Sequence, residues 1–559
     1  MASNNLCAMS EKELGSFEPP TEVEIVSQND EFSTKERIKA CFKPTYQMRR
    51  LKNKGAILIL IWSFLAMWVY YYIKSLVLKG SLYVVEVPIT LVLPIAGWLA
   101  DVRFGRFRVI YWSVWTMWIS ALLLTVSLIV TQLVESYRNS QQCIQVALLT
   151  FLGIGYAGFQ ANIIQFGVDQ LIDASTTEII SFVHWYTWVV ASSGVLHLLT
   201  TCTCIQYNCK LVVPLLLCMS ISIVLCLIFL CKNSFIKEPV TQNPFKLIYI
   251  VMKYAIKNRR PRQRSAFTYC EDEIPSRIDF GKSKYGGPFT TEQVEDVKTF
   301  FRMIGIVLIT SAVYGMTDET AFNDRIFRER VTEKTLRECS YTFFFADTFY
   351  ITGTLLILLN ETLIYPLFYR CLPSIKCYWK VVLGILLHLG RYIVLAILVA
   401  MAKQNYLHTN EPFNNGTVQC PFHKDAVDLS NTLDYRWFAI PNFISAISYL
   451  LIIIGGIEFF CAQVPYSMKG LLTGMFYGLF AVFLMVNGVT LTLFKVKSSI
   501  WKTGTIFSCE FWYLQMKIIL FTIIVFIIFS LVKCYKKRRR EDVLPNEQIF
   551  AERYYSKDV

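Results

Sequence analysis

A carboxylate inside an apolar segment is the part of this sequence best suited to chemistry. Glu458 lies in the run YLLIIIGGIEFFCAQVPYSMKG, residues 449–470, which is long enough to cross a bilayer. An ionised side chain at the bilayer centre costs roughly 2.5–3.5 kcal/mol even on the lenient insertion scale, so such residues are functional candidates. A carboxylate there can pair with an ammonium group or take up a proton. Glu458 is therefore predicted to do one or both.

Among the other polar side chains in apolar segments, Glu361, His184 and Lys74 are further candidates. Glu361, like Glu458, is a possible proton site, and His184 could titrate near neutral pH. The alternative for His184 is an interfacial hydrogen-bonding role near a helix end. Lys74 could bind an anionic group beside Tyr71 and Tyr72, or it could extend to the external interface.

The elements that position these residues are predicted to be membrane helices. The chain has 559 residues, is 54% hydrophobic and 15% aromatic, and has a mean hydropathy of +0.43, which lies outside the usual range for soluble globular proteins. Hydropathy predicts twelve helix-length apolar segments at residues 55–77, 81–100, 107–131, 143–164, 178–200, 210–231, 299–317, 341–369, 377–401, 437–461, 470–494 and 512–534.

Basic residues predict the orientation of these segments. Arg49 and Arg50 precede the first segment, Arg103 and Arg106 follow the second, and the run KKRRR follows the last. By the positive-inside rule both chain ends are expected to be cytosolic, which requires an even number of spans. The formal net charge of +14 is then a topology signal, so no nucleic-acid partner is expected. The sequon at Asn415 falls in a loop predicted to be external and is a candidate glycosylation site.

The organisation predicted from these features is all-α, with two six-helix halves. A polar segment of basic character, containing KNRRPRQR, separates the sixth apolar segment from the seventh. The predicted domains are a disordered cytosolic tail (1–45), a first bundle (46–231), a cytosolic linker (232–298), a second bundle (299–534) and a basic cytosolic tail (535–559). Two such halves are the plan of the major facilitator superfamily, whose halves rock around a midplane site.

The stretch GWLADVRFGRFR, residues 97–108, lies at the turn after the second segment. Gly97 and Gly105 permit close backbone approach and a tight turn. Asp101 can cap a helix or pair with Arg106, and so hold one conformer of a carrier closed. The spacing resembles the signature loop of major facilitators. The alternative is an ordinary basic turn that contains glycine and aspartate.

Three further stretches resemble the proton-dependent oligopeptide transporter family. They are GFQANIIQFGVDQL, which contains Asp169, the linker from residue 264 to 302, and GIEFFCAQVPYSMKG around Glu458; the tail REDVLPNEQIFAERYY is similar to animal members, including peptide/histidine transporters. The resemblance implies a two-lobed carrier of small peptides or amino acids, driven by a proton gradient, in which Glu458 receives the solute's ammonium group. It implies no cofactor other than the proton.

The sequence departs from that family at the first and fourth segments. Where the family carries an E-x-x-E-R block before its tyrosine pair, this chain has Phe64, Met67 and Trp68; where it carries Lys-Pro, this chain has Gln160 and Ala161. Removing one partner of a buried ion pair costs roughly 3–5 kcal/mol, whereas removing all partners can be neutral. Joint replacement is therefore coherent, and it predicts a respecialised site that includes Gln160, with proton coupling altered or lost.

Two functions follow as hypotheses. The first is a secondary carrier in a plasma or endolysosomal membrane, and the second is a non-transporting membrane sensor or scaffold that keeps the fold. The retained turn with Asp101 and Arg106 favours transport, because a scaffold needs no alternating access. An enzyme is not expected, since the sequence has no phosphate-binding glycine loop, no nucleophile elbow and no metal-spaced His/Glu cluster.

Overall fold

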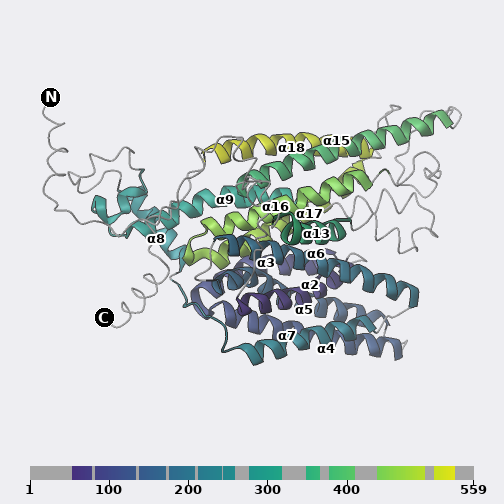
Figure 1. Cartoon of the computed structure of the whole chain (residues 1–559), viewed down its shortest axis with the longest axis horizontal. Helices are drawn as coiled ribbons and strands as arrows, with labels where there is room; N and C mark the ends of the chain where they lie inside the picture. Colours follow the sequence, from purple (N-terminus) through teal and green to yellow (C-terminus); the bar gives the residue numbers. More distant parts are fainter. Residues whose placement is uncertain are drawn as a thin grey trace. The chain divides into compact units, whose positions relative to one another are not determined.

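The computed structural model of the chain is helical throughout the bundle that it describes (Figure 1). The structure describes residues 53–77, 82–133, 138–171, 176–207, 212–241, 243–258, 276–317, 348–365, 377–409, 437, 439–497 and 509–534.

Each of the twelve predicted apolar segments contains a helix. The first half consists of α2 (Lys54–Val77), α3 (Leu82–Leu99), α4 (Arg106–Leu133), α5 (Arg138–Asp169), α6 (Thr176–Tyr207) and α7 (Val212–Cys231). The second half consists of α9 (Thr291–Thr317), α13 (Thr348–Leu359), α15 (Cys377–Thr409), α16 (Ala439–Gln463), α17 (Lys469–Lys497) and α18 (Cys509–Cys534). Within the described residues, eight helices are long and apolar enough to cross a membrane. The expected all-α membrane fold is confirmed.

One helix begins well before its apolar segment. The hydropathy pattern predicts a start at residue 299, but α9 begins at Thr291. Thr290 and Gln293 form a reciprocal capping pair in which each backbone N–H donates to the other's side-chain oxygen at 3.2 Å. Hydropathy does not register this polar start, because a capped helix can extend outside an apolar region.

Two helices from opposite halves approach closely through glycine. The helices α3 and α17 lie side by side (Figure 1). A Cβ atom on Gly97 would lie 2.1 Å from the carbonyl oxygen of Gly470, and one on Gly474 would lie 2.4 Å from the carbonyl oxygen of Leu93. Only residues without a side chain fit at such a crossing, which is a common way for membrane helices to pack. The predicted tight turn is also present, because Gly105 has a φ of 80°.

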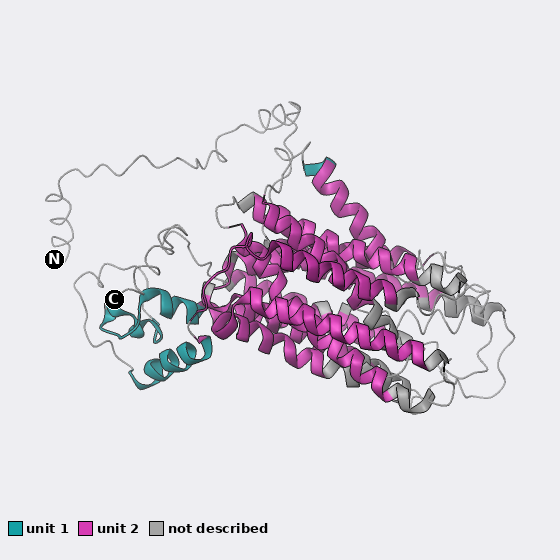
Figure 2. Cartoon of the chain, turned by 90° about the horizontal axis from the view of Figure 1, so that it is seen from below, with its two compact units in different colours: residues 1–48, 244–298, 363–374 teal, residues 49–243, 299–362, 375–559 magenta. Residues whose placement is uncertain are grey.

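The chain divides into two compact units (Figure 2). The larger unit comprises residues 49–243, 299–362 and 375–559 and holds the apolar helices. The described core of the smaller unit lies within residues 244–298, where α8 (Pro244–Lys257) packs through Val251 against Val294 and Val297.

The smaller unit contains its own ion network. The Asp279 carboxylate accepts from Lys282 Nζ at 2.7 Å and from Lys298 Nζ at 2.6 Å, and Glu295 accepts from Lys282 Nζ at 2.5 Å. Burial by itself would raise the pKa of Asp279, but hydrogen bonds from Lys282, Lys298 and Ser276 outweigh it and hold the pKa well below its ordinary value.

Candidate functional site

Four ionisable side chains from four separate segments meet inside the bundle. His184 lies on α6, Glu361 on the π-helical turn Asn360–Ile364 that continues α13, Lys380 in the first turn of α15, and Glu458 near the end of α16. We call these four side chains the acid–base cluster. π-Helical turns are frequent at functional sites because they redirect one side chain of a regular helix, here Glu361.

The distances within the acid–base cluster are those of direct hydrogen bonds. His184 Nδ1 lies 2.5 Å from Glu361 Oε1, and His184 Nε2 lies 3.1 Å from Glu458 Oε1. Lys380 Nζ donates to both oxygens of Glu458, at 2.7 and 2.8 Å. The structure thus brings together the three predicted proton-site residues, which come from distant parts of the sequence.

Three members of the cluster are buried, with side-chain exposures of 1% for Glu361, 7% for Glu458 and 9% for His184. An imidazole can donate from both ring nitrogens only in its protonated form. The position of His184 between two carboxylates therefore suits an imidazolium. With His184 protonated, the two acids and two bases sum to zero charge, which is the arrangement that a buried ion cluster requires.

A second buried ion cluster lies at the helix ends around the predicted turn. Arg106 Nη2 donates to Asp101 at 3.1 Å, Arg106 Nη1 donates to Glu238 at 3.0 Å, and the same nitrogen contacts Asp169. Asp101 and Asp169 are both 3% exposed, so the guanidinium provides the compensating charge for two buried acids. The interpretation that Asp101 pairs with an arginine of the turn agrees with this geometry.

This second cluster also joins the two halves. The backbone N–H of Leu471, in the first turn of α17, donates to Asp101 Oδ2 at 2.9 Å, and Lys469 Nζ lies 3.3 Å from Asp169 Oδ1. A carboxylate at a helix N-terminus satisfies an otherwise unpaired N–H and interacts favourably with the helix dipole. We call this set of Asp101, Arg106, Asp169, Glu238 and Lys469 the helix-end cluster.

The positions where the family motif would place first-helix charges are filled by packing. Met67 and Trp68 are 2% and 6% exposed and belong to an apolar core formed mainly by helices of the first half. The Tyr156 hydroxyl lies 3.0 Å from Met67 Sδ. Gln160, at the position of the family's lysine, donates to the Tyr186 hydroxyl at 3.2 Å. Met67 and Gln160 thus have neutral partners, and the altered proton coupling stays a prediction.

The remaining predicted residues divide into two groups. Tyr71 is buried, donates from its hydroxyl to the Val190 carbonyl at 3.2 Å, and makes an edge contact with Tyr350 of the second half at 4.9 Å between ring centroids. The side chains of Tyr72 and Lys74, and all of Asn415, lie outside the described residues. Their predicted roles remain predictions.

Sequence reasoning missed Lys380, Glu238 and Lys469. Lys380 lies only three residues inside the segment predicted at 377–401, where a lysine reads as an ordinary interfacial charge. Because Lys380 lies within an apolar segment, it could have been counted as a candidate site residue, as Glu361 was. Glu238 and Lys469 lie outside the predicted apolar segments and give no such signal.

The helical membrane fold is of the major facilitator type, and the family match makes the chain a membrane transporter rather than an enzyme. The family model described as POT family matches residues 107–507, and the chain belongs to that family.

Relatives at low identity agree with this assignment. Solute carrier family 15 member 3 of Mus musculus is 22% identical over 436 residues, covering 70% of this chain and 72% of the relative. Protein NRT1/PTR family 6.4 of Arabidopsis thaliana is 21% identical over 496 residues, covering 79% of this chain and 80% of the relative.

Solved structures share the fold. The POT family transporter PepTSo superimposes with a TM-score of 0.60 at 13% identity, covering 86% of this chain and 98% of that one. An auto-inhibited POT family peptide transporter superimposes with a TM-score of 0.54 at 16% identity, covering 88% and 97%. At these identities the likeness establishes the fold alone.

Proposed function

We propose that this protein is a secondary-active carrier that moves small peptides or amino acids across a bilayer by alternating access, and that Glu458 binds the solute's amino group. The observation that supports this most directly is the contact between Lys380 Nζ and both oxygens of Glu458. An ammonium group already sits on this carboxylate at hydrogen-bond distance, so the position has the geometry that an incoming amino group needs.

An exchange of ammonium groups explains how a solute could enter a buried ion cluster. When a solute's amino group replaces Lys380 Nζ on Glu458, the charge balance at that carboxylate stays the same. The large penalty for stranding a buried charge is then avoided, provided that Lys380, the most exposed of these side chains at 18%, moves toward solvent.

His184 is the proposed proton carrier, together with Glu361 and Glu458. Loss of the His184 proton would leave the acid–base cluster with one net negative charge and would remove one donor between the two acids. Because His184 belongs to the first half and the acids belong to the second, its protonation state is proposed to bias how firmly the halves hold together. This coupling differs from that of the family motif, whose first-helix acids are absent here.

The helix-end cluster is proposed to be a gate. It joins the first half to the start of α17, so one side of the bundle can open only if the contacts of Asp101 and Asp169 with the second half are released. We assign this gate to the cytosolic side, with both chain ends cytosolic, on the strength of the basic residues around it. The membrane is proposed to be the plasma membrane or an endolysosomal membrane.

The test is solute uptake by the purified full-length chain in proteoliposomes. Labelled dipeptides and labelled histidine are offered with and without an inward proton gradient. Uptake is expected, with a loss of at least about tenfold for Glu458→Gln, because a neutral amide holds an ammonium group far less strongly. Glu292→Gln is the matched control, since Glu292 is an exposed acid at the start of α9.

Two outcomes would contradict the proposal. If no offered solute is taken up, and Glu458→Gln does not alter the thermal stability response to any of them, the sensor or scaffold hypothesis is favoured. If uptake rises several-fold with acid outside and His184→Gln leaves that rise intact, the assignment of His184 as proton carrier is wrong.

A further inference from the structure

The helix α8 has two apolar faces, of which only one is used within the smaller unit. Pro244, Val251 and Ala255 are buried, and they lie on one side of the helix. Phe245, Tyr249 and Ile256 are 50%, 63% and 72% exposed. A helix that merely covers a core needs a single apolar stripe, so the second stripe requires a separate explanation.

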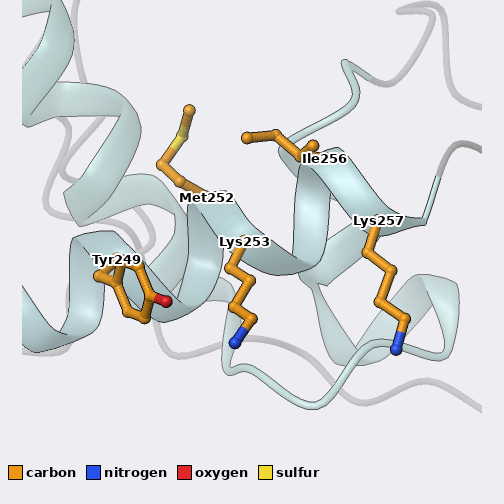
Figure 3. Close-up of a pocket in the computed structure, with 5 residues that line it drawn as sticks. All are labelled: Tyr249, Met252, Lys253, Ile256 and Lys257. Carbon is orange, nitrogen blue, oxygen red and sulfur yellow. The ribbon is translucent and has the colours of Figure 1, made fainter.

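The exposed stripe runs beside a row of lysines. Phe245, Tyr249, Met252 and Ile256 follow the spacing of one helix face, and Lys246, Lys253 and Lys257 follow the adjacent face. Tyr249, Met252 and Ile256 line an open pocket together with Lys253 and Lys257 (Figure 3). Lys253 Nζ lies 5.6 Å from the centre of the Tyr249 ring. We call these four apolar residues and three lysines the exposed face of α8.

We propose that the exposed face of α8 is a lipid-binding surface that lies on the anionic headgroups of the bilayer. Aromatic and aliphatic side chains beside a row of lysines form the pattern of helices that lie in the interface plane. The sequence of α8, PFKLIYIVMKYAIK, contains three lysines and no acidic residue, so its charge complements a surface rich in anionic lipid.

The chain immediately before α8 supports a location at the membrane boundary. The backbone N–H of Thr241 donates to the Asp101 carbonyl at 2.8 Å, and Trp98 Nε1 donates to the Asn243 side chain at 3.4 Å. These contacts hold Thr241 and Asn243 at the end of helix α3. Because α8 begins at the next residue, Pro244, a single peptide bond links these contacts to its first turn.

The experiment measures the accessibility of the lysines in the full-length protein. The chain is reconstituted in nanodiscs of phosphatidylcholine alone, or of phosphatidylcholine with phosphatidylserine at about 7:3. Lysine acetylation rates are then measured residue by residue by mass spectrometry. Lys246, Lys253 and Lys257 are expected to react at least about fivefold more slowly with phosphatidylserine present, and high salt should weaken this protection.

A variant separates lipid binding from local electrostatics. Phe245→Ser with Ile256→Ser keeps the lysines but removes the apolar stripe, and it should return acetylation in the anionic discs to within about twofold of the neutral discs. Both residues are exposed, so an unchanged Tm is expected; Tyr249→Ser is a second variant with the same expectation. Ile236→Ser, at an exposed apolar residue outside α8, is the matched control and should leave the protection in place.

Two results would overturn the inference. Equal acetylation rates in both kinds of nanodisc would show that anionic lipid does not bind the exposed face of α8. Protection that is independent of phosphatidylserine, and that is lost when residues 1–45 are deleted, would show that the acidic N-terminal segment covers this face instead. The outcome is independent of the carrier proposal, because no step of the test requires transport.

Discussion

The acid–base cluster and the helix-end cluster are both buried, both ionic and both shared between the two halves, yet their chemistry differs. The helix-end cluster is centred on Arg106, which stays charged at all relevant pH values, and it uses the backbone N–H of Leu471. The acid–base cluster is centred on His184 and contains an ammonium group on a flexible side chain, that of Lys380. Only the acid–base cluster contains a group that can take up or release a proton near neutral pH and an ammonium group that another ammonium could replace at constant charge.

We propose that this difference separates two tasks of a carrier, with the helix-end cluster as gate and the acid–base cluster as binding site. A gate needs contacts that are either wholly made or wholly broken, which fixed charges and backbone groups provide. A binding site needs partners that a solute or a proton can replace. Substitutions in the two clusters test whether the clusters divide these tasks.

The largest effect is expected for Arg106→Gln. This change strands the buried carboxylates of Asp101 and Asp169, and breaking a buried ion cluster from one side costs roughly 3–5 kcal/mol. A fall in Tm of many degrees and loss of uptake are expected, measured by a thermal melt and by proteoliposome assay. Arg108→Gln is the matched control, since Arg108 is exposed two residues away. If Arg106→Gln and Arg108→Gln lower the Tm and the uptake equally, Arg106 is not the central charge of the helix-end cluster.

Gly97→Ala tests whether the helix-end cluster depends on the close crossing of α3 and α17. The added Cβ would lie 2.1 Å from the Gly470 carbonyl oxygen, so the helices must separate, at about 1–3 kcal/mol. Lower thermal stability with reduced uptake is expected. Gly305→Ala is the control, because a Cβ there meets no atom within 4 Å. A Gly97→Ala protein as stable and active as the control would contradict the proposed closure.

Lys380→Gln sharpens the contrast, because it should act in the opposite direction to Glu458→Gln. Without the Lys380 ammonium, the Glu458 carboxylate loses its two shortest contacts, and a solute's amino group no longer has a competitor. The variant should melt at a lower temperature without solute and show a larger stabilisation by dipeptide, with an apparent affinity of the order of tenfold higher.

Thermal melts over a dipeptide titration check this expectation. Lys253→Gln, which changes an exposed lysine on α8, should behave as the unmodified chain. A dipeptide response that Lys380→Gln leaves unchanged or abolishes would mean that Lys380 does not compete for the amino-group position.

The smallest effect is expected for Asp279→Asn, in the ion network outside the bundle. The pKa of Asp279 is held well below its ordinary value near 4, so its carboxylate stabilises the fold above that value and the stabilisation is lost as pH falls below it. Hydrogen exchange of residues 276–298 should accelerate below about pH 4 in the unmodified chain and show a weaker acid dependence in the variant. Transport at neutral pH should change little. A strong loss of transport in the Asp279→Asn variant would show that this ion network also contributes to the transport cycle.

Much of the fold was predictable because each membrane span is identified from its own run of apolar residues. Runs of about twenty apolar residues locate a span without knowledge of any other span, and each predicted segment contains a helix. The turn at Gly105 and the pairing of Asp101 with Arg106 involve residues close together in sequence, so their geometry was also predictable. The early start of α9 was not predictable from hydropathy, because its capping residues are polar.

The acid–base cluster shows where local information ends. From the apolar segments alone it follows that Glu458, Glu361 and His184 lie among apolar residues and need partners. The identity of those partners depends on the folded bundle, since His184 and Glu458 are 274 positions apart and Lys380 and Glu458 are 78 apart. Ion pairs across that separation depend on how helices cross and which faces turn inward, and those choices are made by packing over the whole bundle.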